Sequence, residues 1–258
     1  MGNKRPMPRF KINLEYDGTD LIGWQENQDG PSVQSVLQDA IFKFSGEKTT
    51  VSSAGRTDAG VHAICMTAHF DLDKDWDSDT VMRAVNFYLV GKPVSVLSCE
   101  RVADDFHSRF NCVKRYYKYI VLNRSAPVVL DKNRVWWVPQ KLDVEKMKSA
   151  AEKLIGKHDF TSFRAAQCQA KSPIKTLDTA TITQDGDKII FEFSARSFLH
   201  HQVRNMVGTL VEIGLGKPYD IDEIFAQKKR GAAGVNAPAS GLYFVVADYA
   251  TDVDLKNS

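Results

Sequence analysis

The chain has 258 residues, of which 43% are hydrophobic and 26% charged, and 34 basic against 32 acidic side chains leave a formal charge of +2. These proportions are typical of folded proteins and exclude the collagen-like, disordered and coiled-coil classes. The length allows one large or two small domains, whose core can be held by packing alone. No apolar run reaches the ~20 residues of a membrane span, and the basic start lacks the apolar stretch of a signal peptide, so we expect a cytoplasmic protein.

The cysteines and the local charge distribution give two further expectations. The four cysteines are widely spaced and contain no C-x-x-C pair, which in a reducing compartment indicates free thiols rather than a disulfide framework or a structural zinc site. From Arg101 to Arg124, six basic side chains stand against two acidic ones. A basic stripe on a nearly neutral protein favours a polyanionic partner such as nucleic acid, although a solvated charged face is the alternative.

The first half of the chain alternates strands and helices. Apolar residues alternate from Phe10 to Tyr16, which predicts a strand, and residues 33–44 repeat apolar positions at helical spacing between a Ser32 cap and Gly46. A second helix is predicted from the apolar face of Ala84, Val85, Tyr88 and Leu89, with its cap at Asp77, Ser78 or Asp79. Further strands are predicted at residues 51–54, 64–70 and 94–102, so the order is β-α-β-β-α-β.

The second half repeats this order. A strand is predicted at residues 117–122 and a helix at 144–154, which ends at Gly156. Two strands meet at the Asp185–Gly186 hairpin signal, and a helix at 198–214 and a strand at 242–249 complete the unit. We therefore predict an α+β protein of two ferredoxin-like (β-α-β-β-α-β) units with antiparallel sheets. The predicted domains are residues 1–110, which contain the loop described next, and residues 111–258.

The most unusual segment runs from Ser53 to His62 between two predicted strands. Gly55 and Gly60 bracket Arg56, Thr57 and Asp58, so the chain can bend sharply and a ligand can approach the backbone. One interpretation is a carboxylate nucleophile beside a cation that contacts phosphate or a base. The alternative is a hairpin in which Asp58 forms an Asx turn and Arg56 is solvated. The dinucleotide and P-loop motifs are absent from the sequence, which favours chemistry without a nucleotide cofactor.

Residues 55–62 (GRTDAGVH) resemble the signature of the TruA family of tRNA pseudouridine synthases, in which the Asp is catalytic. Further motifs in the same order resemble that family over nearly the whole chain. They are residues 106–110 (FHSRF, with Ser108 where the family motif has Ala), 115–119 (RYYKY), 158–163 (HDFTSF), 198–208 (FLHHQVRNMVG) and 241–243 (GLY).

This resemblance implies a pseudouridine synthase fold with a central cleft, and isomerisation of uridine to pseudouridine in the anticodon stem-loop of tRNA. The modified uridines are expected at positions 38–40, the partner is tRNA, the enzyme is a homodimer, and neither a cofactor nor a metal is required. Asp58 is then the catalytic carboxylate and Arg204 its salt-bridge partner, which keeps the carboxylate ionised in a site that excludes water.

The resemblance also assigns residues around the reacting base. Tyr117 is expected to stack on the target uracil and assist proton movement, and Leu242 to wall the pocket. Arg56 is expected to contact the RNA where the uridine flips out of its stack. The remaining basic residues are expected to form a groove that follows the phosphates. They are Arg109, Lys114, Arg115 and Lys118.

Three other interpretations remain open at this stage. A tandem RNA-binding module without catalysis would share the fold, and only the Asp58 loop argues against it. A metal hydrolase could use His62, Cys65 and His69, with the adjacent His200 and His201 as further donors, although no carboxylate at ligand spacing completes the set. A cysteine nucleophile could be Cys112, although a buried structural thiol is the more frequent role.

Overall fold

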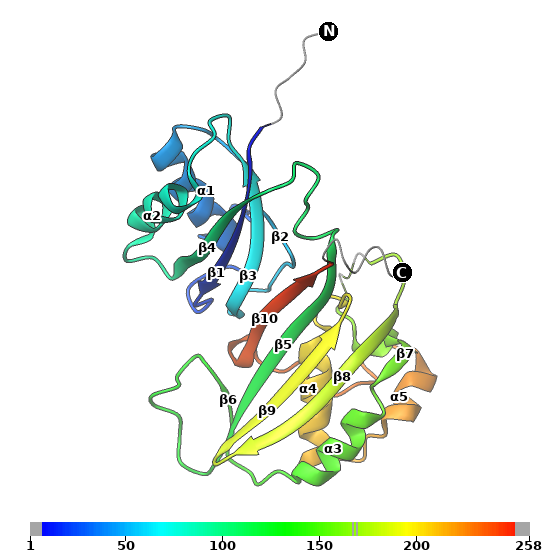
Figure 1. Ribbon diagram of the computed structural model, residues 1–258. Coiled ribbons are helices and arrows are strands. Elements are labelled where there is room, and N and C mark those ends of the chain that lie inside the picture. The colour runs from blue at the N-terminus through cyan, green and yellow to red at the C-terminus, as the bar shows by residue number, and fades with distance from the viewer. Residues whose placement is uncertain (1–6, 167, 169, 251–258) are drawn as a thin grey trace. The chain divides into compact units, whose positions relative to one another are not determined.

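The computed structural model describes residues 7–166, 168 and 170–250, and the chain divides into two compact units. The first unit comprises residues 1–113 and 244–258, and the second comprises residues 114–243. The described residues contain five α-helices and ten strands, and most of the strand pairs are antiparallel. The predicted α+β class is therefore confirmed (Figure 1).

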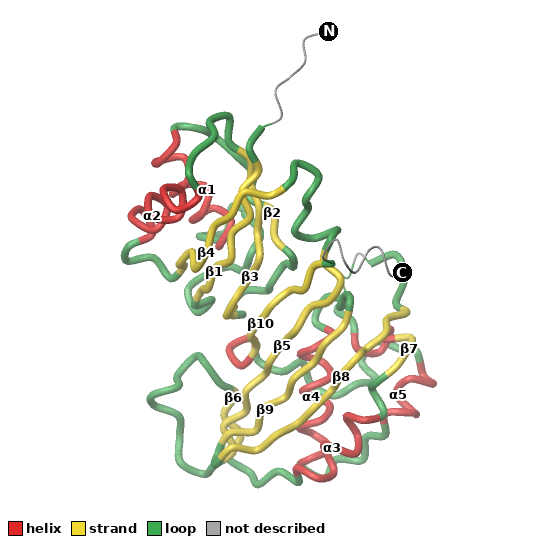
Figure 2. Tube along the Cα trace, viewed as in Figure 1, coloured by secondary structure: helices red, strands yellow, loops and turns green. Residues whose placement is uncertain are grey.

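The first unit has the predicted order of strands and helices. Strands β4, β1 and β3 lie side by side in that order, with β2 paired to β3, and the two helices lie together against this sheet (Figure 2). Strand β10 continues the order after β3. The elements are β1 (Arg9–Tyr16), α1 (Val33–Ser45), β2 (Ser52–Ser53), β3 (His62–Asp71), α2 (Ser78–Leu89), β4 (Val94–Val102) and β10 (Leu242–Tyr249).

Helix α1 begins and ends where the sequence predicts. The Ser32 side chain accepts a hydrogen bond from the Ser35 N–H, while the Ser35 side chain accepts one from Ser32, a reciprocal cap of the first turn. Gly46 ends the helix with a φ of 76°, a left-handed conformation in which glycine avoids the cost of a Cβ. Leu37 and Ile41 are fully buried, so this face anchors the helix to the sheet.

Helix α2 also begins at a predicted residue, because the Asp77 side chain accepts a hydrogen bond from the Thr80 N–H. Its buried face differs from the prediction, which included Tyr88. Val81, Val85 and Leu89 are buried, whereas Tyr88 is 38% exposed. The spacing of four residues between the buried positions defines the apolar face, and Tyr88 lies beside it.

The second unit is a sheet with helices packed on it (Figures 1 and 2). Its strands have the order β5-β9-β8-β7, and β6 pairs with β5 in parallel. Gly186, with a φ of 56°, forms the predicted turn between β8 and β9. The elements are β5 (Cys112–Asn123), β6 (Trp136–Val138), α3 (Val144–Glu152), β7 (Gly156–Asp159), the 3₁₀ turn η1 (Phe160–Phe163), β8 (Ile174–Asp185), β9 (Lys188–Ala195), α4 (Gln202–Gly214) and α5 (Ile221–Gln227).

Four elements of this unit differ from the prediction. Strands β6 and β7 and helix α5 are additions, each too short for a periodic signal to distinguish it from a loop. Helix α4 begins at Gln202 instead of Phe198, because His201 has a φ of 64° and interrupts the helical conformation before that residue.

The structure also divides the chain differently at its C-terminal end. The predicted boundary at residue 110 lies close to the observed one after residue 113, but the predicted second domain included the closing strand. From Phe244 onward this strand belongs to the first unit, where it follows β3 in the strand order. The first unit is therefore built from two segments that are distant in the sequence.

Candidate active site

The Asp58 loop connects β2 to β3 and is held by the backbone of the segment after β1. Gly23 and Asp58 form an isolated antiparallel bridge, and the Trp24 N–H donates to the Thr57 carbonyl over 3.0 Å. The Gly60 N–H donates to the Leu21 carbonyl over 3.4 Å. These main-chain bonds fix the path of the loop on both sides of Asp58.

Side chains beneath the loop reinforce this position. Thr57 is buried, and its hydroxyl lies 2.8 Å from the Tyr16 hydroxyl on β1. The turn that follows Asp58 is closed by a hydrogen bond from the Val61 N–H to the Asp58 carbonyl over 3.2 Å, and Gly60 has a φ of 79°. Thr57 is therefore buried, whereas Asp58 is partly exposed and Arg56 is exposed.

Gly23 is a position that supports this loop and that the sequence analysis missed. Its φ is 104°, and a Cβ at this position would lie 2.6 Å from the Thr57 carbonyl oxygen and 3.0 Å from the Asp58 carbonyl carbon. The loop thus packs directly on the backbone of a glycine. Nothing in the local sequence around Gly23 indicates this contact, because its partner lies in another segment of the chain.

His62, a candidate metal ligand in the sequence analysis, supports the base of the same loop. It is the first residue of β3 and not a loop residue, and it is 2% exposed. Its Nδ1 accepts a hydrogen bond from the Gly18 N–H over 3.0 Å and lies 3.1 Å from Asp17 Oδ1. Through these contacts His62 has a structural role, because it links the turn after β1 to the start of β3.

The motif that contains Arg204 forms the start of α4. The Arg204 Nε donates to the Ala237 carbonyl over 2.7 Å, and the Ala237 N–H donates to the Arg204 carbonyl over 3.2 Å. A Cβ at Gly208, the glycine of the same motif, would overlap the Val235 carbonyl, so α4 packs directly on this segment. The motif therefore orients Arg204 by tying its side chain and backbone to one neighbouring segment.

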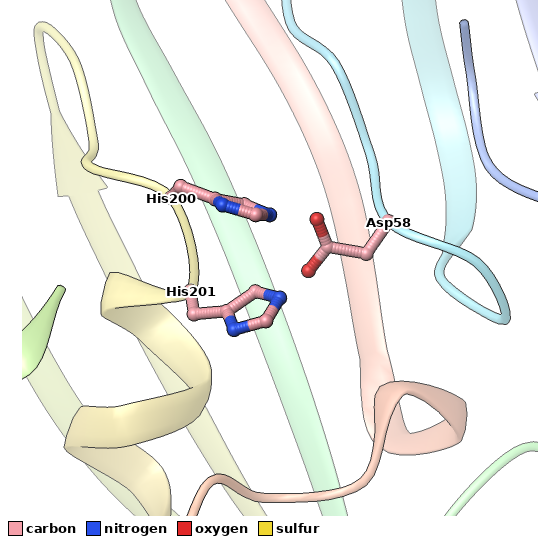
Figure 3. A group of neighbouring side chains, drawn as sticks. All are labelled: Asp58, His200 and His201. Atoms are coloured by element: carbon pink, nitrogen blue, oxygen red, sulfur yellow. The ribbon is translucent and has the colours of Figure 1, made fainter. Parts of the chain in front are cut away.

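The residues just before α4 are two histidines. The rings of His200 and His201 have centroids 4.1 Å apart and planes inclined by 47°. Figure 3 shows these two side chains on the segment that leads into the helix, and Asp58 on its own loop. His200 is exposed and His201 partly exposed.

The tyrosines of β5 have different environments. Tyr117 is partly buried, and its ring lies 5.1 Å from that of Phe198 in an edge-on arrangement of 82°. Tyr119 is fully buried, and its hydroxyl donates to the Pro238 carbonyl over 2.7 Å. Burial raises the pKa of Tyr119 well above the ordinary value, and the nearby charge of Arg204 opposes this shift with a smaller effect. Tyr117 is therefore the accessible tyrosine on this face of the strand, and Tyr119 is structural.

The structure distinguishes the predicted RNA-binding residues by exposure. Arg56 and Arg109 are exposed, Lys118 is partly exposed, and Lys114 forms an ion pair of 3.0 Å with Asp178. Arg115 is only 8% exposed and donates to the Arg196 carbonyl. Its guanidinium donates to a backbone carbonyl just after β9, so Arg115 is the least accessible of the four residues predicted for the phosphate groove. Leu242 is buried at 6% exposure, as expected for a residue that walls a pocket or fills a core.

Cys65, Cys99 and Cys112 have the properties of structural thiols. Cys112, the candidate nucleophile, is 3% exposed. Burial raises the pKa of Cys65, and burial together with Glu100 and other nearby carboxylates raises that of Cys99 to about 12. Because the thiolate is the reactive form, a raised pKa makes these thiols poor nucleophiles near neutral pH.

Comparison with known proteins identifies the family. The sequence model of one family, described as tRNA pseudouridine synthase, matches residues 13–111 and 150–250. A tRNA pseudouridine synthase A from Rhodospirillum centenum is 52% identical over 94% of this chain and 100% of the relative. The relative of the same name from Paramagnetospirillum magneticum is 49% identical over 94% of this chain and 96% of the relative. The one from Bartonella quintana is 47% identical over 94% of this chain and 100% of the relative.

The chain belongs to the tRNA pseudouridine synthase family. It is accordingly an isomerase that converts uridine to pseudouridine in tRNA. In the part of the chain that the structure describes, no helix is both long and apolar enough to cross a lipid bilayer.

Proposed function

We propose that Asp58 is the catalytic carboxylate and that the substrate uridines lie in the anticodon stem-loop of tRNA. The observation that carries the assignment is the anchoring of the Asp58 loop. Backbone bonds to Gly23, Trp24 and Leu21 hold it, while the aspartate itself remains partly exposed. A carboxylate on a loop held this firmly is preorganised for attack on a bound nucleoside.

The isomerisation needs a group that can act as nucleophile or base. The C1′–N1 bond of uridine breaks, the base turns, and a C1′–C5 bond forms, while the proton on C5 leaves and N1 gains one. The atoms balance without exchange of electrons with another molecule. An ionised Asp58 can attack C1′ or C6, or remove a proton during the rearrangement.

The other residues have supporting roles in this proposal. Arg204 pairs with Asp58 and opposes the rise in pKa that exclusion of water would cause. Tyr117 stacks on the uracil, because an aromatic face suits any base and its hydroxyl can move a proton. The fixed orientation of Arg204 by Ala237 and the accessibility of Tyr117 support these roles.

RNA binding outside the reacting base is assigned to the accessible basic residues. Arg56, Arg109, Lys114 and Lys118 bind phosphates or the displaced stack, and Leu242 walls the base pocket. The resemblance in sequence supports a homodimer, and the use of tRNA as substrate supports a cytoplasmic location.

The decisive experiment is Asp58→Asn, which is nearly isosteric and removes the carboxylate. We expect pseudouridine formation to fall by at least about 10²–10⁴-fold, because a positioned base or nucleophile is lost, while tRNA affinity is retained. Release of tritium from C5 of tRNA labelled with [5-³H]uridine measures the reaction, and a filter-binding assay measures affinity.

Cys112→Ser is the matched control, because it also replaces a single side-chain heavy atom, sulfur by oxygen, in the same unit. It should fold, bind and react as the wild type does, since Cys112 is buried. Appreciable turnover by Asp58→Asn, or a folded but inactive Cys112→Ser, would return the cysteine mechanism to consideration.

A further inference from the structure

The second unit contains a pocket of about 500 Å³ that the proposal above does not use. It is formed by the segment that follows η1, the start of α4 and the segment after α5. Its described polar lining includes two arginines, two histidines and two asparagines. They are Arg164, Arg230, His200, His201, Asn205 and Asn236.

Hydrogen bonds tie the three segments of the pocket together. The Ala165 N–H donates to the His200 carbonyl over 2.9 Å, and the Arg230 Nη1 donates to the Ala166 carbonyl over 2.6 Å. The Asn205 side chain, on the first turn of α4, donates to the Phe163 carbonyl over 2.7 Å. The walls are therefore held in place by the protein before any ligand binds.

The charge of the lining is one-sided. Among the described lining residues none is acidic, while Arg164 and Arg230 contribute two permanent positive charges. The Arg164 Nε is buried and has no hydrogen-bond partner in the structure. A buried donor left without a partner costs about 1–3 kcal/mol, so this atom indicates a site at which an acceptor is expected.

The arginines can bind an anion in a defined orientation. A guanidinium has five N–H donors, and the bond from Arg230 to Ala166 uses one of them and fixes the plane of the group. The remaining donors match the oxygens of a phosphate in pairs. The 13-residue helix α4 begins at this pocket, and its N-terminal end adds a partial positive charge.

We infer that this pocket binds a phosphodiester group of the tRNA backbone, with Arg164 and Arg230 as its main contacts. This inference rests on tRNA being the substrate, and it assigns the RNA a contact region within the second unit. The volume falls within the range of nucleotide-sized ligand sites, so a phosphate with part of its sugar can enter. Arginine provides the paired hydrogen bonds, and the asparagines can bind sugar hydroxyls.

The test measures tRNA affinity as a function of salt for Arg164→Gln and Arg230→Gln. Each variant should bind more weakly and should reduce the slope of log K against log salt by about 0.7–0.9, the value for one lost phosphate contact. KM should rise more than kcat falls. Arg230→Lys keeps the charge and should retain part of the affinity, because lysine offers a point charge in place of a fork.

Lys148→Gln is the control, since it removes one charge from the exposed ion pair with Glu145 on α3 of the same unit. Thermal unfolding identifies any variant that fails to fold. If one of the two arginine variants fails, the other variant is used for the binding measurement. A set of tRNAs, each with one neutral methylphosphonate linkage in the anticodon arm, locates the contacted phosphate. One of these tRNAs should bind the wild type more weakly than unmodified tRNA does. The same tRNA should bind Arg230→Gln as well as unmodified tRNA does, because that variant has already lost the contact.

Two results would overturn the inference. The first is a salt slope for both arginine variants that equals that of Lys148→Gln. The second is a pair of arginine variants that no longer bind inorganic phosphate but bind tRNA with the affinity of the wild type. That result would assign the pocket to a free anion. Because these readouts measure binding, they are independent of catalysis. An active Asp58→Asn variant would contradict the proposed catalytic role and leave the pocket inference standing.

Discussion

At the scale of single residues, the candidate site depends on side chains whose orientation the backbone enforces. Arg204 donates to Ala237, and Tyr119 donates to Pro238, so polar groups near the start of α4 and on β5 are held by main-chain carbonyls. A held cation acts on its partner without the entropy cost of ordering a long side chain at each turnover. The direction of a guanidinium is thus as important as its presence.

Arg204→Ala should reduce turnover much more than tRNA binding. In the proposed pairing the guanidinium favours the charged form of Asp58, so its removal should move the acid-side midpoint of the activity profile to higher pH. Arg204→Lys should restore only part of the rate. The pH dependence of kcat measures the effect, with the exposed Arg196→Ala as control. A wild-type rate and pH profile for Arg204→Ala would exclude this role.

His69 predicts a pH dependence of folding stability. Burial, then repulsion by His107 and Arg9, lowers its pKa to about 4, while Asp71 opposes this shift. The unfolded chain, with an ordinary pKa of about 6.5, binds the proton more readily between these values. Stability should therefore be lost as the pH falls from about 6.5 to about 4, and be fully present above that window.

Urea denaturation at pH 7 and pH 4.5 measures this effect. The wild type should lose more stability between the two pH values than His69→Gln, which cannot bind the proton. The Ser108 N–H donates to His69 Nδ1 over 3.3 Å, and its hydroxyl lies 2.8 Å from that nitrogen, so the neutral ring is the form that fits. Equal losses in both proteins would show that His69 titrates normally.

At the scale of secondary-structure elements, the Asp58 loop and the segment after β1 behave as one structural piece. The loop is bounded by a two-residue strand, β2, which alone could not position it. Its position comes from the Gly23 bridge and from the Thr57 contact with Tyr16 on β1. A change in the supporting segment should therefore alter catalysis without any change in Asp58.

Gly23→Ala should destabilise the protein and reduce turnover. The left-handed backbone costs about 1–2 kcal/mol for a residue with a Cβ, and that Cβ would also press on the Thr57 carbonyl. Gly91→Ala is the matched control, because Gly91 has a φ of 77° but nothing within 4 Å of an added Cβ. It should cost stability alone. Equal activity of the two folded variants would show that Gly23 does not position the loop.

At the scale of the whole molecule, the chain is nearly neutral, yet its substrate is a polyanion. The accessible basic residues proposed for RNA binding are distributed over both units, with Arg56 and Arg109 in the first and Lys114 and Lys118 in the second. Binding by such dispersed contacts releases counterions, so affinity should be strongly dependent on salt.

We expect tRNA affinity to fall steeply between low and physiological ionic strength, and the protein to sediment as a dimer at micromolar concentration. Lys118→Gln should reduce the salt slope by about 0.7–0.9 as one phosphate contact is lost. Arg115→Gln should instead lower thermal stability, because Arg115 is buried in the sheet. A monomer, or binding insensitive to salt, would contradict this proposal.

Local sequence signals determined most of the secondary structure. Ser32 and Gly46 specify the ends of α1, and Asp185–Gly186 specifies the turn between β8 and β9, because caps and turns depend on residues a few positions apart. The ordered motifs likewise indicate the family from sequence alone. Asp58 was a candidate because of the two glycines that flank it.

Only the tertiary structure decided which distant segments meet. It places Gly23 against the Asp58 loop, buries Arg115, joins β10 to the first unit, and forms the cationic pocket around Arg164 and Arg230. None of these contacts has a local signal, because burial and packing depend on residues that are far apart in the chain. Periodicity and capping are properties of neighbouring residues, whereas a site is assembled from segments that the fold alone brings together.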